Sequence, residues 1–148
     1  MRVKLINDGS EKTYAVILET GEEVASQLQR FAKEHALDAS RFTAIGAFSS
    51  ATLGYFSWEQ KEYEKIAINE QVEVLSLIGD IALQDDEPKT HMHVVVGKRD
   101  GTAHGGHLLA AYVRPTLEII VTESPGYLKR SFDAESGLAL ISIGPESV

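Results

Sequence analysis

The sequence has 148 residues, a length that suits one domain with its own hydrophobic core. Its 43% hydrophobic and 24% charged residues are ordinary for a globular protein, and the absence of cysteine excludes disulfides and cysteine-ligated zinc. The net charge of −8 would repel phosphate and disfavours direct DNA binding. No apolar stretch resembles a signal peptide or a membrane helix, so we expect a cytoplasmic protein without membrane contact.

The first part of the chain predicts two strands and one helix. Residues 3–5 alternate apolar and polar side chains, and residues 14–18 form a continuous apolar run, with a turn at residues 8–10 between them. A continuous run predicts a strand that is buried on both faces. Residues 22–35 predict the main helix, because Val24, Leu28 and Phe31 follow helical spacing. Thr20 and Glu23 match a capping box at its start.

The remaining predicted elements are strands. Apolar segments with strand character lie at residues 42–48, 51–56, 63–68, 72–83, 91–97, 107–108, 117–122 and 137–141. Gly79 is a candidate bulge within one of them. About eight strands and one main helix predict an α+β fold for residues 1–148, as a single compact domain with a mixed or antiparallel sheet.

Three histidines are the strongest candidates for chemistry. His91 and His93 are two residues apart, so on one strand both side chains leave the same face. His107 follows after a hairpin signal at residues 98–101. Three imidazoles on one face suit zinc, which binds neutral histidine and would dissociate below about pH 6. The alternative is a group of polar strand residues on a solvent-exposed face.

The register of the hairpin decides whether His107 joins the other two histidines. A two-residue loop would place His107 opposite Val94, on the wrong face. A three-residue loop over residues 99–101 would instead pair His93 with His107. Such loops have a left-handed third residue, usually glycine, and Gly101 occupies that position. The turn residues therefore permit the register that a metal site needs.

Two features of the returning strand bear on this prediction. Gly105 and Gly106 predict a bulge that bends the strand and would change the register, in preference to a close approach of a ligand or another subunit. His104 is three residues from His107, so the two side chains point to opposite faces of a regular strand. We expect His104 at the surface or at the edge of a pocket.

Two acidic residues within apolar strands are candidates for contact with the histidines. Glu118 alternates with Leu117 and Ile119, which we expect to point into the core. Glu118 is therefore a candidate fourth metal ligand, acceptor for a histidine N–H or general base. Asp80, which also lies within an apolar strand, is the second candidate for contact with the histidines. The alternative is that Asp80 is a carboxylate at a strand edge or turn without a role in the site.

Other histidine-based families fit the sequence less well. The first motif of a cupin also begins with His-x-His, but Gly97 stands where a cupin has glutamate. A hydrolase of the His-x-His-x-Asp-His type would have aspartate at the position of Val95. The sequence contains no serine or cysteine nucleophile motif.

One segment resembles the signature of the PPC (plants-and-prokaryotes-conserved) domain: HMHVVVGKRDG at residues 91–101, followed by GGHL at residues 105–108. The likeness extends to residues 75–81 before the histidines, to residues 117–121 after them and to residues 130–133 and 136–138 near the end. In plants this domain follows a DNA-binding AT-hook. This chain has no Arg-Gly-Arg-Pro core and no basic arm, so it resembles the stand-alone prokaryotic type.

The resemblance implies a compact α+β domain that assembles as a homotrimer. It also implies that His91, His93 and His107 are the family's histidines, which hold a metal, zinc in first place, near a subunit contact. In the plant proteins the AT-hook supplies the electrostatic attraction to DNA, while the domain mediates association.

Our leading hypothesis is a cytoplasmic, homotrimeric PPC-domain protein with zinc as its cofactor. In an enzyme of this kind, zinc would activate water or polarise a carbonyl of a small-molecule ligand, with Glu118 as the candidate proton acceptor. Two other classes remain open at this point: a non-enzymatic oligomerisation module and a DNA-associated regulatory protein.

Overall fold

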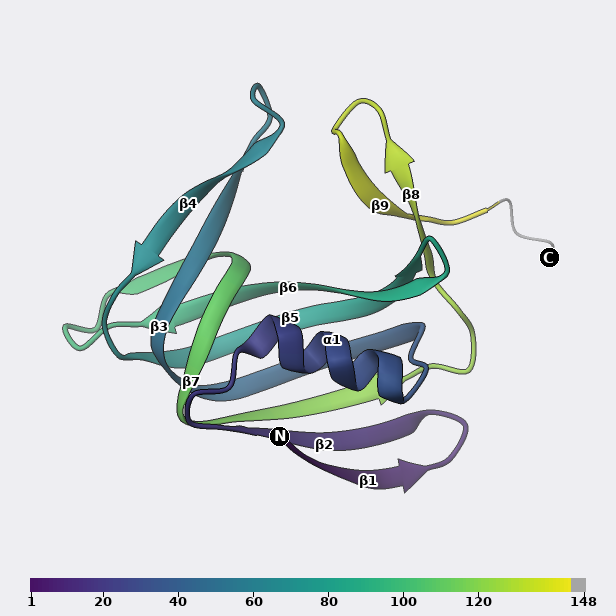
Figure 1. The fold of residues 1–148 in the computed structure, drawn as a ribbon, viewed down its shortest axis with the longest axis horizontal. Coiled ribbons are helices and arrows are strands. Elements are labelled where there is room, and N and C mark those ends of the chain that lie inside the picture. The colour runs from purple at the N-terminus through teal and green to yellow at the C-terminus, as the bar shows by residue number, and fades with distance from the viewer. Residues whose placement is uncertain (145–148) are drawn as a thin grey trace.

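A computed structural model describes residues 1–144, which contain nine strands and one helix (Figure 1). The helix is α1 (Val24–Glu34). The strands, in chain order, are β1 (Arg2–Asp8), β2 (Lys12–Glu19), β3 (Ala39–Ser57), β4 (Glu62–Ile68), β5 (Val72–Gln84), β6 (Glu87–Gly97), β7 (Ala103–Glu123), β8 (Lys129–Asp133) and β9 (Leu138–Ser142). All nine strands belong to one mixed sheet, in which β5 and β8 alone pair in parallel within the described chain. The predicted α+β class is confirmed.

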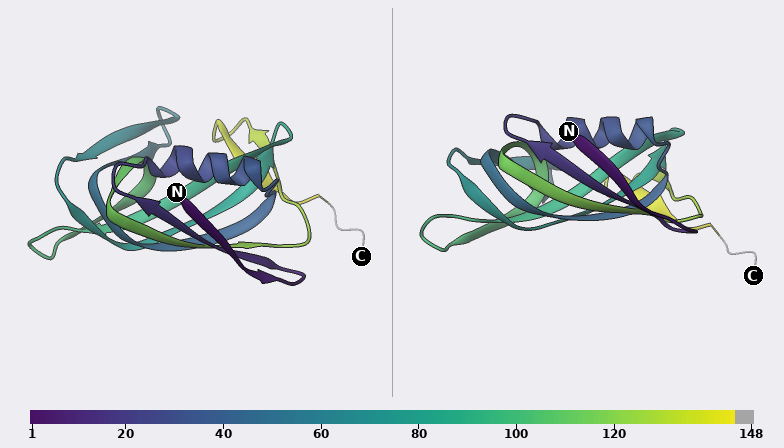
Figure 2. Two further views of the ribbon diagram at one scale, coloured as in Figure 1. Left: turned by 60° about the horizontal axis from the view of Figure 1, so that its bottom comes forward. Right: turned by 90° about the horizontal axis from the view of Figure 1, so that it is seen from below.

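Strands β3 and β7 are longer than the sequence predicts. Residues 42–48 and 51–56 both lie in β3, and residues 107–108 and 117–122 both lie in β7. The two strands pair along most of their length, with three register shifts. Because β3 also pairs with β5, β5 with β6, and β6 with β7, these four strands form a closed circuit. Figure 2 shows the strongly curved sheet that results.

Helix α1 lies over the concave side of this sheet and completes the core (Figure 2). Its Val24, Leu28 and Phe31 side chains are fully buried, as the helical spacing predicts. Complete burial of each contributes about 1.5–3 kcal/mol, so this face of α1 secures the helix to the sheet. No helix within residues 1–144 combines the length and apolar character needed to cross a membrane.

The cap of α1 differs from the predicted capping box. The N-cap is Glu23, whose carboxylate accepts hydrogen bonds from the backbone N–H groups of Ala25 (3.1 Å) and Ser26 (2.7 Å). The Thr20 hydroxyl instead donates to the backbone carbonyl of Pro115, at 3.1 Å. The helix begins one turn later than a Thr20 cap would allow because Glu23 satisfies two of the free N–H groups itself.

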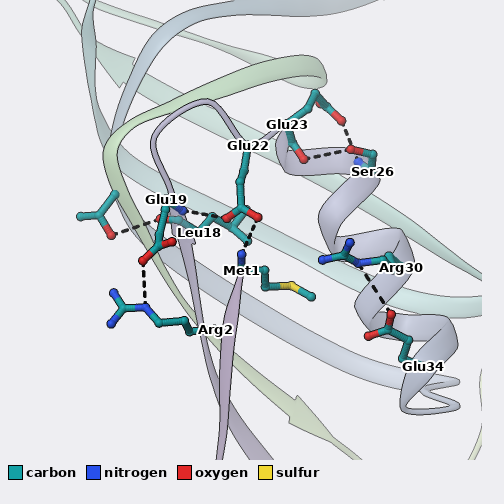
Figure 3. A network of polar contacts seen from close by, with 10 residues as sticks. Met1, Arg2, Leu18, Glu19, Glu22, Glu23, Ser26, Arg30 and Glu34 are labelled. Carbon is teal, nitrogen blue, oxygen red and sulfur yellow. Dashed lines mark hydrogen bonds and ion pairs between the residues drawn. The ribbon is translucent and has the colours of Figure 1, made fainter.

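Polar contacts fasten the N-terminal hairpin to the start of α1 (Figure 3). The Met1 amino group pairs with the Glu22 carboxylate, which also accepts a hydrogen bond from the Glu19 N–H at 2.8 Å. Burial would raise the pKa of Glu22, but the Met1 amino group and the Glu19 N–H outweigh that effect and lower it. Glu22 is therefore charged at neutral pH and joins the chain start to the helix.

The burial of β2 corrects another expectation. Tyr14, Val16 and Leu18 are buried, whereas Ala15 and Ile17 between them are half-buried. The strand is thus buried on one face and partly covered on the other. Its apolar run reflects the partial cover, in addition to the core on the concave side.

Candidate metal centre

The β6–β7 hairpin has the register of a three-residue loop, one of the two that the sequence left open. The Lys98 N–H donates to the Thr102 carbonyl at 2.8 Å, and the Gly101 N–H donates to the Lys98 carbonyl at 2.9 Å. Gly101 has a φ of +82°, the left-handed conformation that this loop requires. This closure pairs His93 directly with His107.

The glycine pair at the start of β7 does not form the predicted bulge. The β6–β7 ladder is regular from the His93–His107 pair to the pair of Gly97 with Ala103. A Cβ atom at Gly106 would lie 2.9 Å from the Gly54 carbonyl oxygen of β3, which is closer than real Cβ atoms come. Gly106 therefore allows the close approach of β3, and the uninterrupted ladder keeps His107 on the face of His93.

Gly79 is not a bulge either. It pairs regularly with Phe42 on β3 and with Met92 on β6, and the β5–β6 register shift lies between Val74 and Ser76. A Cβ atom at Gly79 would meet the Phe42 ring and the His91 carbonyl oxygen. Glycine at this position makes room for both neighbours, on the strand beside the segment that carries His91 and His93.

The alternation of β6 places the histidines on the convex, outer face of the sheet. Met92 and Val94 are buried in the core, and His91 and His93 alternate with them. His107 faces the same way because it is the direct partner of His93. His93 is exposed, while His91 and His107 are half-buried. The prediction that these three side chains share one face is confirmed.

The three imidazoles converge. Their ring centroids lie 5.2 Å apart for His91 and His93, 5.1 Å for His91 and His107, and 5.3 Å for His93 and His107. One ligand nitrogen from each ring lies within 4.8 Å of the other two. Two nitrogens on one tetrahedral zinc ion lie about 3.3 Å apart, so these side chains would close by up to about 1.5 Å to hold it.

The electrostatics of the cluster favour neutral imidazoles. Burial, together with the neighbouring His91 and His93, lowers the pKa of His107 to about 4. Burial and the neighbouring His91 also lower the pKa of His93. At neutral pH both rings therefore offer lone pairs. The Nδ1 atom of His107 is buried and has no hydrogen-bond partner in the described chain, an arrangement that a metal ligand would explain.

Two side chains support the histidines, and the strand pattern did not predict either role. The Tyr63 ring from β4 stacks on His107, with centroids 4.6 Å apart, and burial raises the pKa of Tyr63. Arg130 from β8 forms an ion pair with Asp80. The sequence could not predict these roles because no local spacing links β4 or β8 to the hairpin. The one available signal was that Arg130 lies in a segment that resembles the PPC domain.

Of the two acidic candidates, Asp80 lies next to the histidine cluster. Its Oδ2 atom lies 3.8 Å from Nδ1 of His91, an ion-pair distance longer than a direct hydrogen bond. Burial would raise the pKa of Asp80, but His91 and Arg130 outweigh that effect and lower it. Asp80 is thus a charged neighbour that can orient the His91 ring.

The structure does not bring Glu118 to the histidines. Glu118 is exposed on the outer face of β7, opposite Ile45 of β3, and β3 and β5 lie between it and β6. Among the residues that the structure describes, no acidic side chain joins the cluster of ligand atoms. His104 is half-buried and also lies outside that cluster. Leu117 and Ile119 do point into the core, as expected.

Fold and site together define a small α+β protein with a three-histidine candidate metal centre on the outer face of its sheet. The model of one protein family, the Plants and Prokaryotes Conserved (PCC) domain, matches residues 6–125. The chain belongs to this family, which confirms its resemblance to the PPC domain.

Solved structures agree with this assignment. A metal-containing protein from Archaeoglobus fulgidus is 34% identical, with a TM-score of 0.82 over 96% of this chain and 97% of that chain. A PPC protein from Pyrococcus horikoshii is 32% identical, with a TM-score of 0.84 over 98% and 97%. A candidate DNA-binding protein from Bacteroides thetaiotaomicron is 26% identical, with a TM-score of 0.85 over 95% and 96%.

Two curated relatives are much longer proteins. Both are called bifunctional protein GlmU and come from Synechococcus sp. strains JA-3-3Ab and JA-2-3B'a(2-13). They are 30% identical over 121 residues and 29% identical over 140 residues. The matches cover 80% and 93% of this chain, but 18% and 21% of the relatives. The chain therefore spans about a fifth of the length of these proteins.

Proposed function

We propose that this chain is a metal-binding PPC-domain protein of the cytoplasm, which holds zinc through His91, His93 and His107 and assembles as a homotrimer. Two observations carry the proposal: one ligand nitrogen from each histidine converges with the other two, and the buried Nδ1 of His107 has no hydrogen-bond partner in the described chain. The metal-containing relative from Archaeoglobus fulgidus supports it. The net charge of −8 disfavours the alternative of direct DNA binding.

Each residue of the site has a distinct task in this proposal. The three histidines would hold a zinc ion and leave its fourth coordination position free for water or a ligand. The zinc would supply a Lewis acid that activates water or polarises a carbonyl. Asp80, held by Arg130, orients His91 from its Nδ1 side. The Tyr63 ring fixes the plane of His107 by stacking. In a non-enzymatic protein the same metal would tie β6 to β7 and rigidify the hairpin.

The outer face of the sheet supports self-association. We define the outer patch as five apolar side chains on β3, β5, β6 and β7 that are between 40% and 61% exposed: Ile45, Leu75, Ile78, Val95 and Ile120. Exposed apolar groups gathered on one face mark interaction surfaces. Ile78 pairs directly with His93, so a subunit seated on the outer patch would lie next to the metal centre.

Metal analysis tests the proposed centre directly. Protein produced without a histidine tag and dialysed against zinc should retain about one zinc ion per chain, measured by elemental analysis. A chelator should remove the zinc, and added zinc should restore it. Zinc far below one per chain after reconstitution would contradict the proposal.

Light scattering coupled to size-exclusion chromatography tests the trimer. The unmodified chain should have three times the 16.2 kDa mass of one chain. Ile120→Lys should shift this mass toward 16.2 kDa, because it places a charge in the outer patch, on the side of the patch away from the histidines. Ile6→Lys, at an exposed position of β1 outside the patch, is the matched control and should leave the mass unchanged. A monomer at micromolar concentration of unmodified protein would refute the trimer.

A further inference from the structure

We propose that the cleft beside the three histidines binds a small carboxylate, with the charged group toward His91 and Lys89 and the hydrocarbon part against β9. This inference deepens the proposed function by naming the class of ligand, and it rests on that function for the metal. The cleft has a volume of about 250 Å³ and is bounded by β4, β5, β6, β8 and β9. His91 and Tyr63 connect it to the centre, because His91 belongs to the cluster and Tyr63 stacks on His107.

The charge of the cleft is opposite to that of the whole molecule. The chain has 22 acidic and 14 basic residues, yet no acidic residue of the described chain lines the cleft. Its lining includes Lys89, Arg130 and His91. Asp80 compensates Arg130, whereas Lys89 has no ion pair within residues 1–144. A divalent metal on neutral histidines would add positive charge, so an anion is the preferred occupant.

The other lining residues limit the size and shape of that anion. Leu138, Ala139 and Leu140 of β9 provide an apolar wall. Pockets for drug-sized ligands range from about 300 to 1,000 Å³, so a cleft of 250 Å³ fits a smaller molecule. A short aliphatic chain that ends in a carboxylate satisfies both the positive side and the apolar wall. Phosphate or sulfate would satisfy only the first.

Carboxylate oxygen is also a good ligand for zinc. A carboxylate seated in the cleft would lie beside His91, where one of its oxygens could occupy the fourth position that three histidines leave free. Lys89 would then neutralise the second oxygen, and Tyr63 offers a hydroxyl for hydrogen bonding. The metal and the cleft would therefore strengthen each other's binding of the anion.

Nuclear magnetic resonance titration with sodium butyrate tests this inference on the full zinc-loaded chain. Butyrate should shift the amide resonances of Ala139 and Leu140, while butylammonium, which has the same hydrocarbon chain and the opposite charge, should not. Lys89→Gln should weaken butyrate binding about fivefold, because it removes one exposed charge. Lys4→Gln, at an exposed position on β1, should change nothing. Leu140 is exposed on the apolar wall, so Leu140→Glu should weaken butyrate binding more strongly than the uncharged Leu140→Gln.

The outcomes separate this inference from the proposed function. Zinc at about one per chain, with no butyrate shift at β9 or with equal binding of butylammonium, would overturn the carboxylate cleft and leave the metal centre intact. Butyrate binding that depends on Lys89 in a chain that takes up no zinc would support the cleft and overturn the metal centre. Butyrate that binds more tightly after zinc is added would support both.

Discussion

Replacement of His93 with alanine should weaken zinc binding by more than about 100-fold. Loss of a residue that only orients a metal ligand costs about 10–100-fold in metal affinity, so loss of the ligand itself should cost more. The two remaining histidines would provide too few ligands for a stable site with zinc's usual three or four protein donors. Competition with a chromophoric zinc chelator measures the affinity, and elemental analysis after dialysis measures the retained zinc.

His93 is the informative ligand to replace because its side chain is exposed. The alanine variant should keep the fold, whereas removal of the half-buried His107 would also disturb Tyr63. His104→Ala is the matched control, since His104 lies on the same hairpin and outside the cluster. Equal zinc affinity of the His93 variant and unmodified protein would show that the three imidazoles do not bind metal together.

Replacement of Gly79 with alanine should destabilise the protein by about 3 kcal/mol. The new Cβ atom would lie 2.3 Å from Cζ of Phe42 and 2.4 Å from the His91 carbonyl oxygen. Phe42 is 2% exposed, so its ring cannot move into solvent, and the second clash is with backbone. Overpacking of this kind typically costs about 1–3 kcal/mol, and two rigid neighbours place this site at the upper end. Urea denaturation monitored by circular dichroism gives the free energy of unfolding.

Gly126→Ala is the matched control for this substitution. Gly126 does not have a positive φ, and no atom lies within 4 Å of a Cβ built at its position. Its replacement should change the free energy of unfolding by less than about 0.5 kcal/mol. Both variants are compared with the unmodified protein at one chain concentration, because self-association would couple stability to concentration. A Gly79 variant as stable as the Gly126 variant would contradict the close approach of Phe42 and β6.

Short-range patterns were sufficient for the helix face and for the hairpin that carries the histidines. Side chains alternate on every strand, so the spacing of His91 and His93 placed them on one face. The Asp100-Gly101 turn permitted the three-residue loop, and the structure adopts this loop, which pairs His93 with His107. Both predictions depend on backbone geometry over a few residues, which sequence encodes directly.

The glycines show where local patterns fail. Gly79 and Gly106 each suggested a bulge, but both lie in regular ladders. Their reason is the approach of a distant group: Phe42 at Gly79 and the Gly54 carbonyl at Gly106. The same limitation explains why the sequence predicted β3 and β7 as two strands each. A continuous strand that bends around a curved sheet has the sequence pattern of two separate strands.

The sequence by itself singled out the three histidines of the candidate metal centre, because alternation and turn chemistry act within one hairpin. Only the tertiary structure decided what surrounds that centre. Asp80 and Arg130 meet because β8 pairs with the far end of β5, and Tyr63 reaches His107 because β4 and β7 both pair with β3. Glu118 has the same strand pattern as Asp80, yet β3 and β5 separate it from His91 and His93, and it lies far along β7 from His107. Contacts between strands distant in sequence depend on the closure of the sheet, which no local spacing records.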